Sequence, residues 1–354
     1  MQLDRLKISD KPNIFDVFVA RLYRWVKTKL RLANRFTVLS YAGFGDASTV
    51  KVMGRVVEKI KKPSPNVNSH KVMNLIYLLK IFGRARAESV ALKIDIDGRS
   101  HKVVTDGLGF FELNLERKKK EKSDKWSWSH LPASKTDQRL NPAKGNAHIY
   151  DFSTAKQTVI SIISDIDDTV LESSATDLWQ SAKVTFLHNA ETRIAVKGMS
   201  GLYNAILDQN IFEKDKSQMF YVTSSSWSLF SILSRFLTLN DFPLGPILMQ
   251  SVGVTNNKFR SRGHSHKLDK IKVILNMSGE TKFVLVGDSG QEDREIFLEI
   301  ARWFPERIFA VLVRKVDQIP TNYPKMFKSL GTKYCEFTDI AEAQRFVELM
   351  KMRT

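Results

Sequence analysis

The sequence predicts an α/β protein: a doubly wound parallel-sheet domain, preceded by a small all-β, sandwich-like domain and an N-terminal amphipathic helix. Three observations carry this prediction. Apolar runs alternate with helical stretches over 157–354, short strand-like runs separated by turn residues fill 36–156, and a basic helical pattern with an apolar stripe lies within 1–35. Alternating strands and helices are typical of a parallel sheet, and short strands with regular turns are typical of a β-sandwich.

Residues 14–35 form the clearest predicted helix. Its apolar face carries Phe15, Phe18, Val19, Leu22, Trp25, Val26 and Leu30, and its basic face carries Arg21, Arg24, Lys27, Arg31 and Arg35. Two interpretations fit this pattern. The apolar stripe packs against a domain of the same chain, as in most amphipathic helices. Alternatively, the helix lies in the plane of a membrane, where basic residues on one face and Trp and Phe on the other are common.

Residues 36–156 are predicted to form the β-rich domain. Its strand-like runs are FTVLSYAGF, TVKVMGRVV, NLIYLLKIF, SVALKIDI, KVVTD and FFELNL, with glycines and Asp-Gly pairs as turn signals between them. The stretches 61–71 and 116–130 are predicted to be polar loops. The second mixes lysines with Trp126 and Trp128, which suits either a solvated loop or contact with an anionic membrane surface.

Residues 157–354 are predicted to form the parallel-sheet domain. Its strands are the nearly continuous apolar runs TVISIIS, MFYVT, PILM, FVLVG and IFAVLV, and its helices include GMSGLYNAILDQN, SLFSILSRFL, KLDKIKVILNM and EIFLEIARWF. Strands that are buried on both faces have this composition. Because ligands bind at the carboxyl ends of the strands in such sheets, the functional residues are expected there.

The charge of the chain is uneven. Its 354 residues include 55 Lys and Arg against 38 Asp and Glu. Residues 1–156 carry 31 basic and 15 acidic side chains, whereas residues 157–354 carry 24 and 23. This asymmetry predicts a polyanionic partner for the first part of the chain, either nucleic acid or an anionic membrane surface.

Several classes of protein are excluded by composition. Cys335 is the single cysteine, which rules out intrachain disulfides and cysteine-based zinc or iron–sulfur sites. Apolar runs of about 18 residues, the length of a membrane-spanning helix, do not occur. The first residues lack the apolar core and small-residue cleavage site of a secretory signal. We therefore expect a cytoplasmic protein that associates with membranes peripherally.

Acidic side chains follow two of the predicted strands. Asp165, Asp167 and Asp168 come directly after TVISIIS, and Asp288 and Asp293 follow FVLVG. Carboxylates this close raise one another's pKa unless a cation neutralises them. If the two strands are neighbours, these side chains converge as hard oxygen ligands that suit Mg²⁺. An acidic turn that caps a helix is the alternative.

Two further strand ends offer phosphate-binding groups. Thr223 and Ser224 stand at the expected start of a helix, where hydroxyl and N–H groups bind phosphoryl oxygens or simply cap the helix. Lys267 opens the next helix, either as a phosphate-facing cation or as an ordinary surface lysine. Three basic residues precede it and either steer an anionic headgroup into the site or face solvent: Lys258, Arg260 and Arg262.

Together these motifs resemble the haloacid-dehalogenase-like phosphotransferase superfamily, in which a DxDxT motif, a hydroxyl, a lysine and a GDxxxxD motif follow one another. The segments SDIDDTV, FLHNAETRIAVKGMSGLYNAIL, YVTSSSWSLF, FPLGPILM, SHKLDKI, GDSGQEDREIF and PERIFAVLVRK are similar to the phosphatidate phosphatase family typified by the fungal actin patch protein. SYAGFG, VKVMGRVV and VTDGLGFFEL resemble its N-terminal β-rich domain. The sequence departs from the family at Arg294, where Pro is usual, and at Phe297, where Tyr is usual.

The resemblance implies an enzyme that hydrolyses phosphatidate to diacylglycerol and phosphate. It makes Asp165 the nucleophile, which forms an aspartyl-phosphate, and Asp167 the general acid and base. Thr223, with Ser224 as the alternative, is expected to hold a phosphoryl oxygen. Lys267 is expected to neutralise charge on the nucleophile and on the transferring group.

The resemblance also implies Mg²⁺ as the cofactor. Asp165 and Asp288 are the expected carboxylate ligands, and Asp293 binds the ion directly or orients its waters. Asp167 is expected to contribute its backbone carbonyl.

Two other functions use the same features of the sequence. A phosphatase of this superfamily can act on nucleotides or polynucleotides, with the basic half bound to nucleic acid. A membrane or cytoskeletal adaptor can retain such a site without using it. The basic residues are paired with apolar faces, which favours phosphatidate or another anionic phospholipid and a membrane surface as partners, and makes nucleic acid the less expected one.

Overall fold

The computed structural model describes residues 36–351 except 42, 61–67, 70, 86, 118–124, 131–143, 153–158, 172–189, 192, 209–217, 251–261 and 317–321. The described residues fall into two compact units, one within Met1–Ser153 and the other within Thr154–Gln250 and Asn257–Thr354. The helix predicted over 14–35 lies outside the described residues, and so do Lys258 and Arg260.

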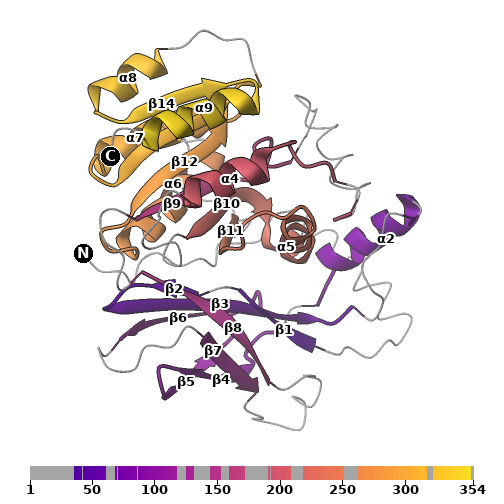
Figure 1. Ribbon diagram of the computed structural model, residues 1–354. Coiled ribbons are helices and arrows are strands. Elements are labelled where there is room, and N and C mark those ends of the chain that lie inside the picture. The colour runs from indigo at the N-terminus through magenta and orange to yellow at the C-terminus, as the bar shows by residue number, and fades with distance from the viewer. Residues whose placement is uncertain are drawn as a thin grey trace. The chain divides into compact units, whose positions relative to one another are not determined.

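The first unit is mainly antiparallel β-structure. Its strands are β1 (Phe36–Ser40), β2 (Gly43–Gly45), β3 (Thr49–Glu58), β4 (Ala91–Ile96), β5 (Arg99–Val104), β6 (Phe110–Glu116), β7 (Lys125–His130) and β8 (Lys144–Asp151). They pair in the order β1-β3-β2-β8-β7-β4-β5, with β6 joined to β3 (Figure 1). The pairing of β2 with β8 is parallel. Apolar side chains of β1, β3, β4, β6 and β8 share one buried cluster, which includes Val52, Leu92 and Phe111.

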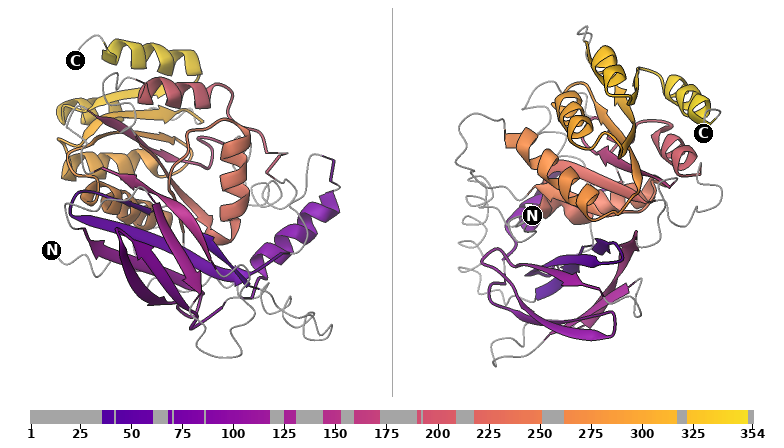
Figure 2. Two further views of the ribbon diagram at one scale, coloured as in Figure 1. Left: turned by 60° about the horizontal axis from the view of Figure 1, so that its bottom comes forward. Right: turned by 90° about the vertical axis from the view of Figure 1, so that its left-hand side faces the viewer.

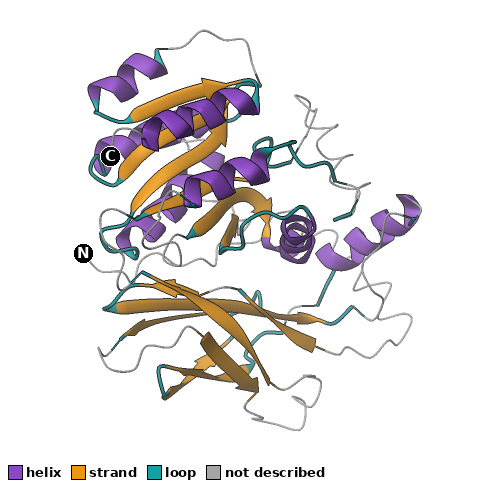
Figure 3. Cartoon of the chain, in the orientation of Figure 1, coloured by secondary structure: helices purple, strands orange, loops and turns teal. Residues whose placement is uncertain are grey.

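Two segments of this unit differ from the sequence prediction. The run NLIYLLKIF, predicted as a strand, lies in helix α2 (Lys71–Phe82), drawn in purple in Figure 3. Its buried residues Asn74, Leu78 and Ile81 are three or four positions apart, which is the period of a helix face. The end of the predicted loop 116–130 is strand β7, which pairs with β4 and β8. Its alternation of Trp and Ser is a strand pattern.

Arg117, the first cation of the run RKKK, is not part of a solvated loop. Its side chain is buried, with Nε 2.8 Å from Oδ2 of Asp97 and Nη1 3.3 Å from Oδ1 of Asp151. These ion pairs join the end of β6 to the turn after β4 and to the end of β8. Part of the positive charge of the first unit is therefore structural.

The second unit is built on a six-stranded parallel sheet, as predicted. The strands are β9 (Ile160–Asp165), β10 (Met219–Ser226), β11 (Ile247–Gln250), β12 (Lys282–Asp288), β13 (Ile308–Arg314) and β14 (Lys333–Phe337). Their order is β11-β10-β9-β12-β13-β14. All six residues of β9 are buried, as are the last six of β12, which explains the continuous apolar runs. Strand β14 is not predicted from the sequence, because KYCEF is short and mixes polar with apolar residues.

Helices cover both faces of this sheet. They are α4 (Met199–Leu207), α5 (Phe230–Leu239), α6 (Arg262–Asn276), α7 (Asp293–Trp303), α8 (Tyr323–Ser329) and α9 (Ile340–Lys351). Helix α4 contacts β9 and α9 on one face, and α6 contacts β10 and α7 on the other (Figure 2). Among the described residues, no helix is both long enough and apolar enough to cross a bilayer.

Arg294, one of the departures from the family pattern, has a partner in β14. Its Nε lies 3.1 Å from Oε1 of Glu336, and the arginine side chain is buried. An arginine at this position of α7 is therefore neutralised by the neighbouring sheet edge.

Gly245 marks a close approach of two backbone segments at the start of β11. A Cβ at this position would lie 1.8 Å from the carbonyl oxygen of Met219. We expect Gly245→Ala to lower the free energy of unfolding by about 2 kcal/mol or more, because the backbone must shift. A Cβ on Gly201 in α4 would meet nothing within 4 Å, and Gly201→Ala is expected to raise stability by about 0.5–1 kcal/mol. Thermal unfolding measures both, and an unchanged melting temperature for Gly245→Ala would contradict this packing.

Candidate active site

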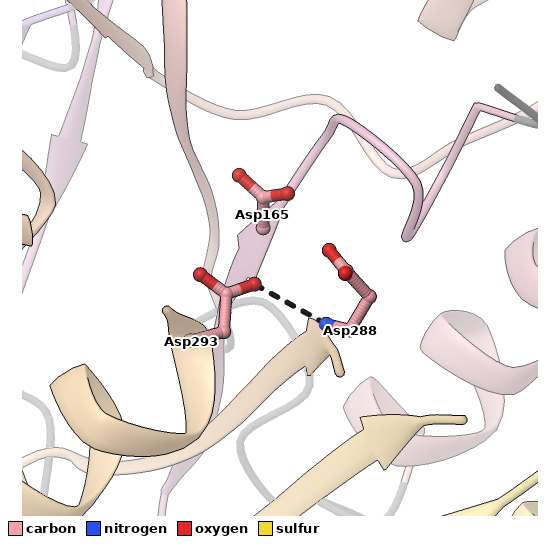
Figure 4. Close-up of side chains that lie close together, drawn as sticks. All are labelled: Asp165, Asp288 and Asp293. Atoms are coloured by element: carbon pink, nitrogen blue, oxygen red, sulfur yellow. Dashed lines mark hydrogen bonds between the residues drawn. The ribbon is translucent and has the colours of Figure 1, made fainter. Parts of the chain in front are cut away.

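Three buried carboxylates meet at the carboxyl ends of β9 and β12. Val286 pairs with Ser164 in parallel register, so the final residues of the two strands, Asp165 and Asp288, lie at the same edge of the sheet. Asp293 begins α7 and points to the same place (Figure 4). One carboxylate oxygen from each aspartate lies within 4.8 Å of the others, and the three residues are at most 3% exposed.

The turn between β12 and α7 fixes two of these carboxylates. Oδ1 of Asp288 accepts hydrogen bonds from the N–H groups of Gly290 at 2.7 Å and Gln291 at 3.1 Å. The N–H of Asp288 donates to Oδ2 of Asp293 at 3.2 Å (Figure 4). A Cβ on Gly287 would lie 2.5 Å from the same Oδ2. The motif GDSGQED therefore needs its first glycine to let Asp293 approach the strand.

Lys267 is the cation of the site. Its side chain comes from α6 and is buried, with Nζ 2.8 Å from Oδ1 of Asp165 and 2.7 Å from Oδ1 of Asp293. Nζ also donates to Oε1 of Gln291 at 3.2 Å. Burial by itself would lower the pKa of Lys267, but the two carboxylates raise that pKa above its usual value. The side chain therefore stays charged, and the alternative of an ordinary surface lysine is wrong.

One ammonium group does not neutralise this cluster. Burial raises the pKa of Asp165 well above its ordinary value; Lys267 opposes this shift, and the other carboxylates add to it. Burial and the charge of Asp293 raise the pKa of Asp288 to about 7. Oδ2 of Asp165 accepts no hydrogen bond from any described residue. The three carboxylates could hold a divalent cation that would supply the missing charge, and buried carboxylate oxygens without His or Cys are ligands that fit Mg²⁺.

The carboxylate of Asp167 has different partners. Its Oδ2 accepts hydrogen bonds from the hydroxyls of Thr223 at 2.6 Å and Ser225 at 3.3 Å. Both hydroxyls come from the end of β10, where Val222 pairs with Asp165. Asp167 is thus held on the β10 side of Asp165, whereas Asp288 lies on the β12 side. A carboxyl group anchored in this way is placed for proton transfer.

Of the remaining predicted residues, some contact the site and others do not. Thr223 is buried and contacts Asp167, whereas no hydrogen bond among the described residues joins the Ser224 hydroxyl to the site. Asp168 has a φ of 58°, and its carbonyl accepts a hydrogen bond from Nη1 of Arg314 at 2.7 Å, so it is a turn residue. Arg262 is the first residue of α6.

Three contributors to the site are not predicted by the sequence analysis: Ser225, Gln291 and His266. Burial, helped by nearby Lys270, lowers the pKa of His266 to about 3, and its neutral ring bonds to the backbone of Thr223. His266 thereby ties the end of β10 to α6, next to Lys267. In the sequence, the one hint that His266 belongs to the site is its position next to Lys267. Its contact with the end of β10 cannot be predicted before the order of the strands is known.

Comparison with known proteins finds a similar family for this part of the chain. Residues 160–315 match the family model described as "Phosphatidate phosphatase APP1, catalytic domain". The match covers less than half of the chain, and this segment is similar to that family. The resemblance inferred from the motifs is confirmed over these residues, which include Asp165, Thr223, Lys267, Asp288 and Asp293.

Curated relatives match similar parts of the chain. Phosphatidate phosphatase APP1 of Saccharomyces cerevisiae is 32% identical over 167 residues, which are 47% of this chain and 27% of that protein. An uncharacterised protein of Schizosaccharomyces pombe is 25% identical over 201 residues, 56% of this chain and 32% of that protein. The nonsense-mediated mRNA decay protein 2 of S. cerevisiae is 24% identical over 186 residues, 50% of this chain and 16% of that protein. The chain therefore spans less than a third of the length of each.

Solved structures match this chain only weakly. A chain in the Pnkp1/Rnl/Hen1 complex has 13% identity and a TM-score of 0.27, with 53% of each chain covered. A carbohydrate acetylesterase from Xanthomonas citri has 9% identity and a TM-score of 0.33, with 88% of this chain and 71% of that one covered. Neither TM-score indicates a shared fold.

Mg²⁺ is expected to stabilise the chain through Asp288. Excess Mg²⁺ should raise the melting temperature of the wild type, since a ligand that binds the folded state stabilises it by about 2.7 kcal/mol at 100 times its Kd. Asp288→Asn should melt above the wild type in chelator, because one buried like charge is removed, and Mg²⁺ should not shift it. Asp339→Asn, at an exposed carboxylate before α9, should respond like the wild type. A full Mg²⁺ shift in Asp288→Asn would contradict the site.

Proposed function

We propose that the chain is a Mg²⁺-dependent phosphatidate phosphatase. Its catalytic domain, over 157–354, is haloacid-dehalogenase-like, and the β-rich domain over 36–156 is sandwich-like. One observation carries the proposal: buried Asp165, paired with Lys267, lies beside Asp288 and Asp293 in a segment that matches a phosphatidate phosphatase family. The reaction converts phosphatidate and water to diacylglycerol and phosphate.

Asp165 is the proposed nucleophile. Its carboxylate oxygen attacks phosphorus, the bond from phosphorus to the glycerol oxygen breaks, and an aspartyl-phosphate forms. Lys267 holds Oδ1 at 2.8 Å, while Oδ2 has no hydrogen-bond partner among the described residues. One oxygen is thus oriented and the other is available for attack. When bound, Mg²⁺ supplies positive charge that stabilises the transferring phosphoryl group.

Asp167 is the proposed proton donor and acceptor. In its protonated form it gives a proton to the departing glycerol oxygen, which yields diacylglycerol. As a carboxylate it then takes a proton from the water that attacks phosphorus. The bond between Asp165 and phosphorus breaks, phosphate leaves, and both side chains return to their starting states. The hydroxyls of Thr223 and Ser225 keep Asp167 in place during both steps.

The proposed substrate resides in a bilayer, so the enzyme must work at a membrane surface. The 31 basic and 15 acidic residues of 1–156 support peripheral attachment to anionic lipids on the cytoplasmic face. Residues 157–354 have 24 basic and 23 acidic side chains, so the attraction to anionic lipids is expected from the first part of the chain.

Asp165→Asn tests the chemistry. In mixed micelles with Mg²⁺ the wild type should release phosphate from phosphatidate, and the variant should lose at least about 10³-fold in kcat, as nucleophile removal does in other enzymes. Asp241→Asn is the matched control, because Asp241 is exposed and has a φ of 54° that Asn also adopts. Its rate should stay within about twofold of the wild type.

The substrate is tested in the same assay. Wild-type turnover of a soluble phosphomonoester or nucleotide without release from phosphatidate would contradict the lipid substrate and keep the phosphatase chemistry. Absence of turnover on every substrate would favour an adaptor with an unused site.

Binding to anionic vesicles is expected to depend on the first part of the chain. Replacing Lys118 and Lys119 by Gln should weaken binding about 30-fold at low salt, because each lysine near an anionic bilayer contributes about 1 kcal/mol. Replacing the exposed Lys325 and Lys328 of α8 removes the same charge from the second unit, and binding should change by less than about twofold. Vesicle sedimentation measures both. An equal loss in the two variants would contradict attachment through the first part.

A further inference from the structure

Arg193 lies in a segment that runs beside the DxDxT turn. Ala195 forms a β-bridge with Leu171, and the N–H of Val196 donates to the carbonyl of Val170 at 2.9 Å. These bonds fix the segment against the chain that follows β9. Arg193, two residues before the bridge, is therefore held at the carboxyl end of the sheet.

The guanidinium of Arg193 has donors without acceptors. Its Nε and Nη2 atoms are buried and make no hydrogen bond with any described residue, although the residue as a whole is partly exposed. A buried donor without a partner costs about 1–3 kcal/mol. Nε–H and Nη2–H are the two parallel donors of the guanidinium fork, which matches two oxygens of one phosphoryl group. A partly exposed side chain can be reached by such a ligand.

Asp167 is the charged neighbour of this guanidinium. Burial lowers the pKa of Arg193, and the negative charge of Asp167 opposes that shift. No ion pair joins these two described side chains, and Oδ2 of Asp167 accepts the hydroxyls of Thr223 and Ser225 instead. Arg193 therefore faces the region of Asp167 while its two buried donors remain available to a third group.

The charge of the site leaves room for a cation in addition to Lys267 and a metal. Among the described residues, the four carboxylates Asp165, Asp167, Asp288 and Asp293 share one ammonium group, that of Lys267, which pairs with Asp165 and Asp293. Even with a divalent cation, an arriving phosphate monoester adds its own negative charge to a site that is not positive. A guanidinium beside the phosphoryl group offsets this repulsion where it matters for binding and for the transition state.

We propose that Arg193 binds the phosphoryl group of the substrate on the side of Asp167, with Nε and Nη2 as donors to two phosphoryl oxygens. This assignment rests on the proposed phosphatase function and adds a substrate-binding residue to it. Lys267 then neutralises the nucleophile side of the group, and Arg193 neutralises the leaving-group side.

The test uses the full chain and two variants, Arg193→Gln and Arg193→Lys. Titration calorimetry with inorganic phosphate in the presence of Mg²⁺ should show about 10- to 100-fold weaker binding for Arg193→Gln, because a charge-assisted pair is lost. Arg193→Lys should bind with intermediate affinity, since it keeps the charge and loses the fork. With phosphatidate, Arg193→Gln should raise KM or lower kcat by a similar factor. The melting temperature shift with Mg²⁺ should be unchanged in both variants.

Arg235→Gln is the matched control. The side chain of Arg235 is 40% exposed and forms an ion pair with Glu191, two residues before Arg193. Its replacement loosens the same segment without removing the proposed donor, so phosphate affinity should stay within about twofold of the wild type.

The outcomes separate this assignment from the proposed function. If the wild type hydrolyses phosphatidate and Arg193→Gln binds phosphate and turns over like the wild type, Arg193 is not a substrate-binding residue. If Arg235→Gln loses as much affinity as Arg193→Gln, the role is structural and the assignment fails. If the wild type does not act on phosphatidate but Arg193→Gln still loses phosphate binding, phosphatidate is not the substrate and the role of Arg193 in phosphate binding is supported. If Arg193→Gln does not fold, Arg193→Lys provides the test. Phosphate affinity equal to the wild type in a folded Arg193→Lys would contradict binding through the two parallel donors Nε and Nη2.

Discussion

Repulsion among carboxylates buried at the ends of two adjacent parallel strands is the constraint on which the catalytic unit depends. The parallel pairing of β9 and β12 brings Asp165 and Asp288 to the same edge of the sheet, and the turn into α7 adds Asp293. Burial and mutual repulsion raise the pKa of Asp165 and Asp288, so the arrangement is unfavourable until cations enter it. Lys267 is one such cation, and Mg²⁺ is the natural second one. The proposed binding of a metal thus follows from electrostatics already present in the folded chain.

The strand order divides the chemistry between the two sides of β9. On the β12 side lie the carboxylates suited to a metal, and on the β10 side lies Asp167, held by Thr223 and Ser225. Asp165 stands between them, in reach of Lys267. The proposed nucleophile and proton carrier therefore both follow from β9, the carboxylates suited to a metal come from β12 and α7, and β10 supplies the hydroxyls that hold Asp167. This separation suits the proposed mechanism, in which one carboxylate attacks while another exchanges a proton.

The sequence predicts the parallel sheet and the clustering of its acidic residues because both follow from local patterns. Continuous apolar runs identify strands buried on both faces, and the acidic motifs stand where those runs end. The prediction fails where the pattern is ambiguous or the contact is non-local. NLIYLLKIF is apolar enough for a strand, yet it forms most of helix α2. KWSWSH is polar by composition but alternates as a strand, and its partners β4 and β8 are distant in the chain. The sequence does not mark three residues near Asp167 and Thr223 as part of the site, because the fold is needed to bring them there: Ser225, His266 and Arg193.

The central claim is that Asp165 carries the phosphoryl group during turnover. The most direct measurement is a rapid acid quench of the wild type with phosphatidate and Mg²⁺, followed by borohydride reduction and mass spectrometry of the peptide that contains Asp165. Borohydride reduces an acyl phosphate to an alcohol, so homoserine is expected at position 165, and only when substrate and Mg²⁺ are both present. Phosphate release at the normal rate with unmodified Asp165 in every quenched sample would contradict the account.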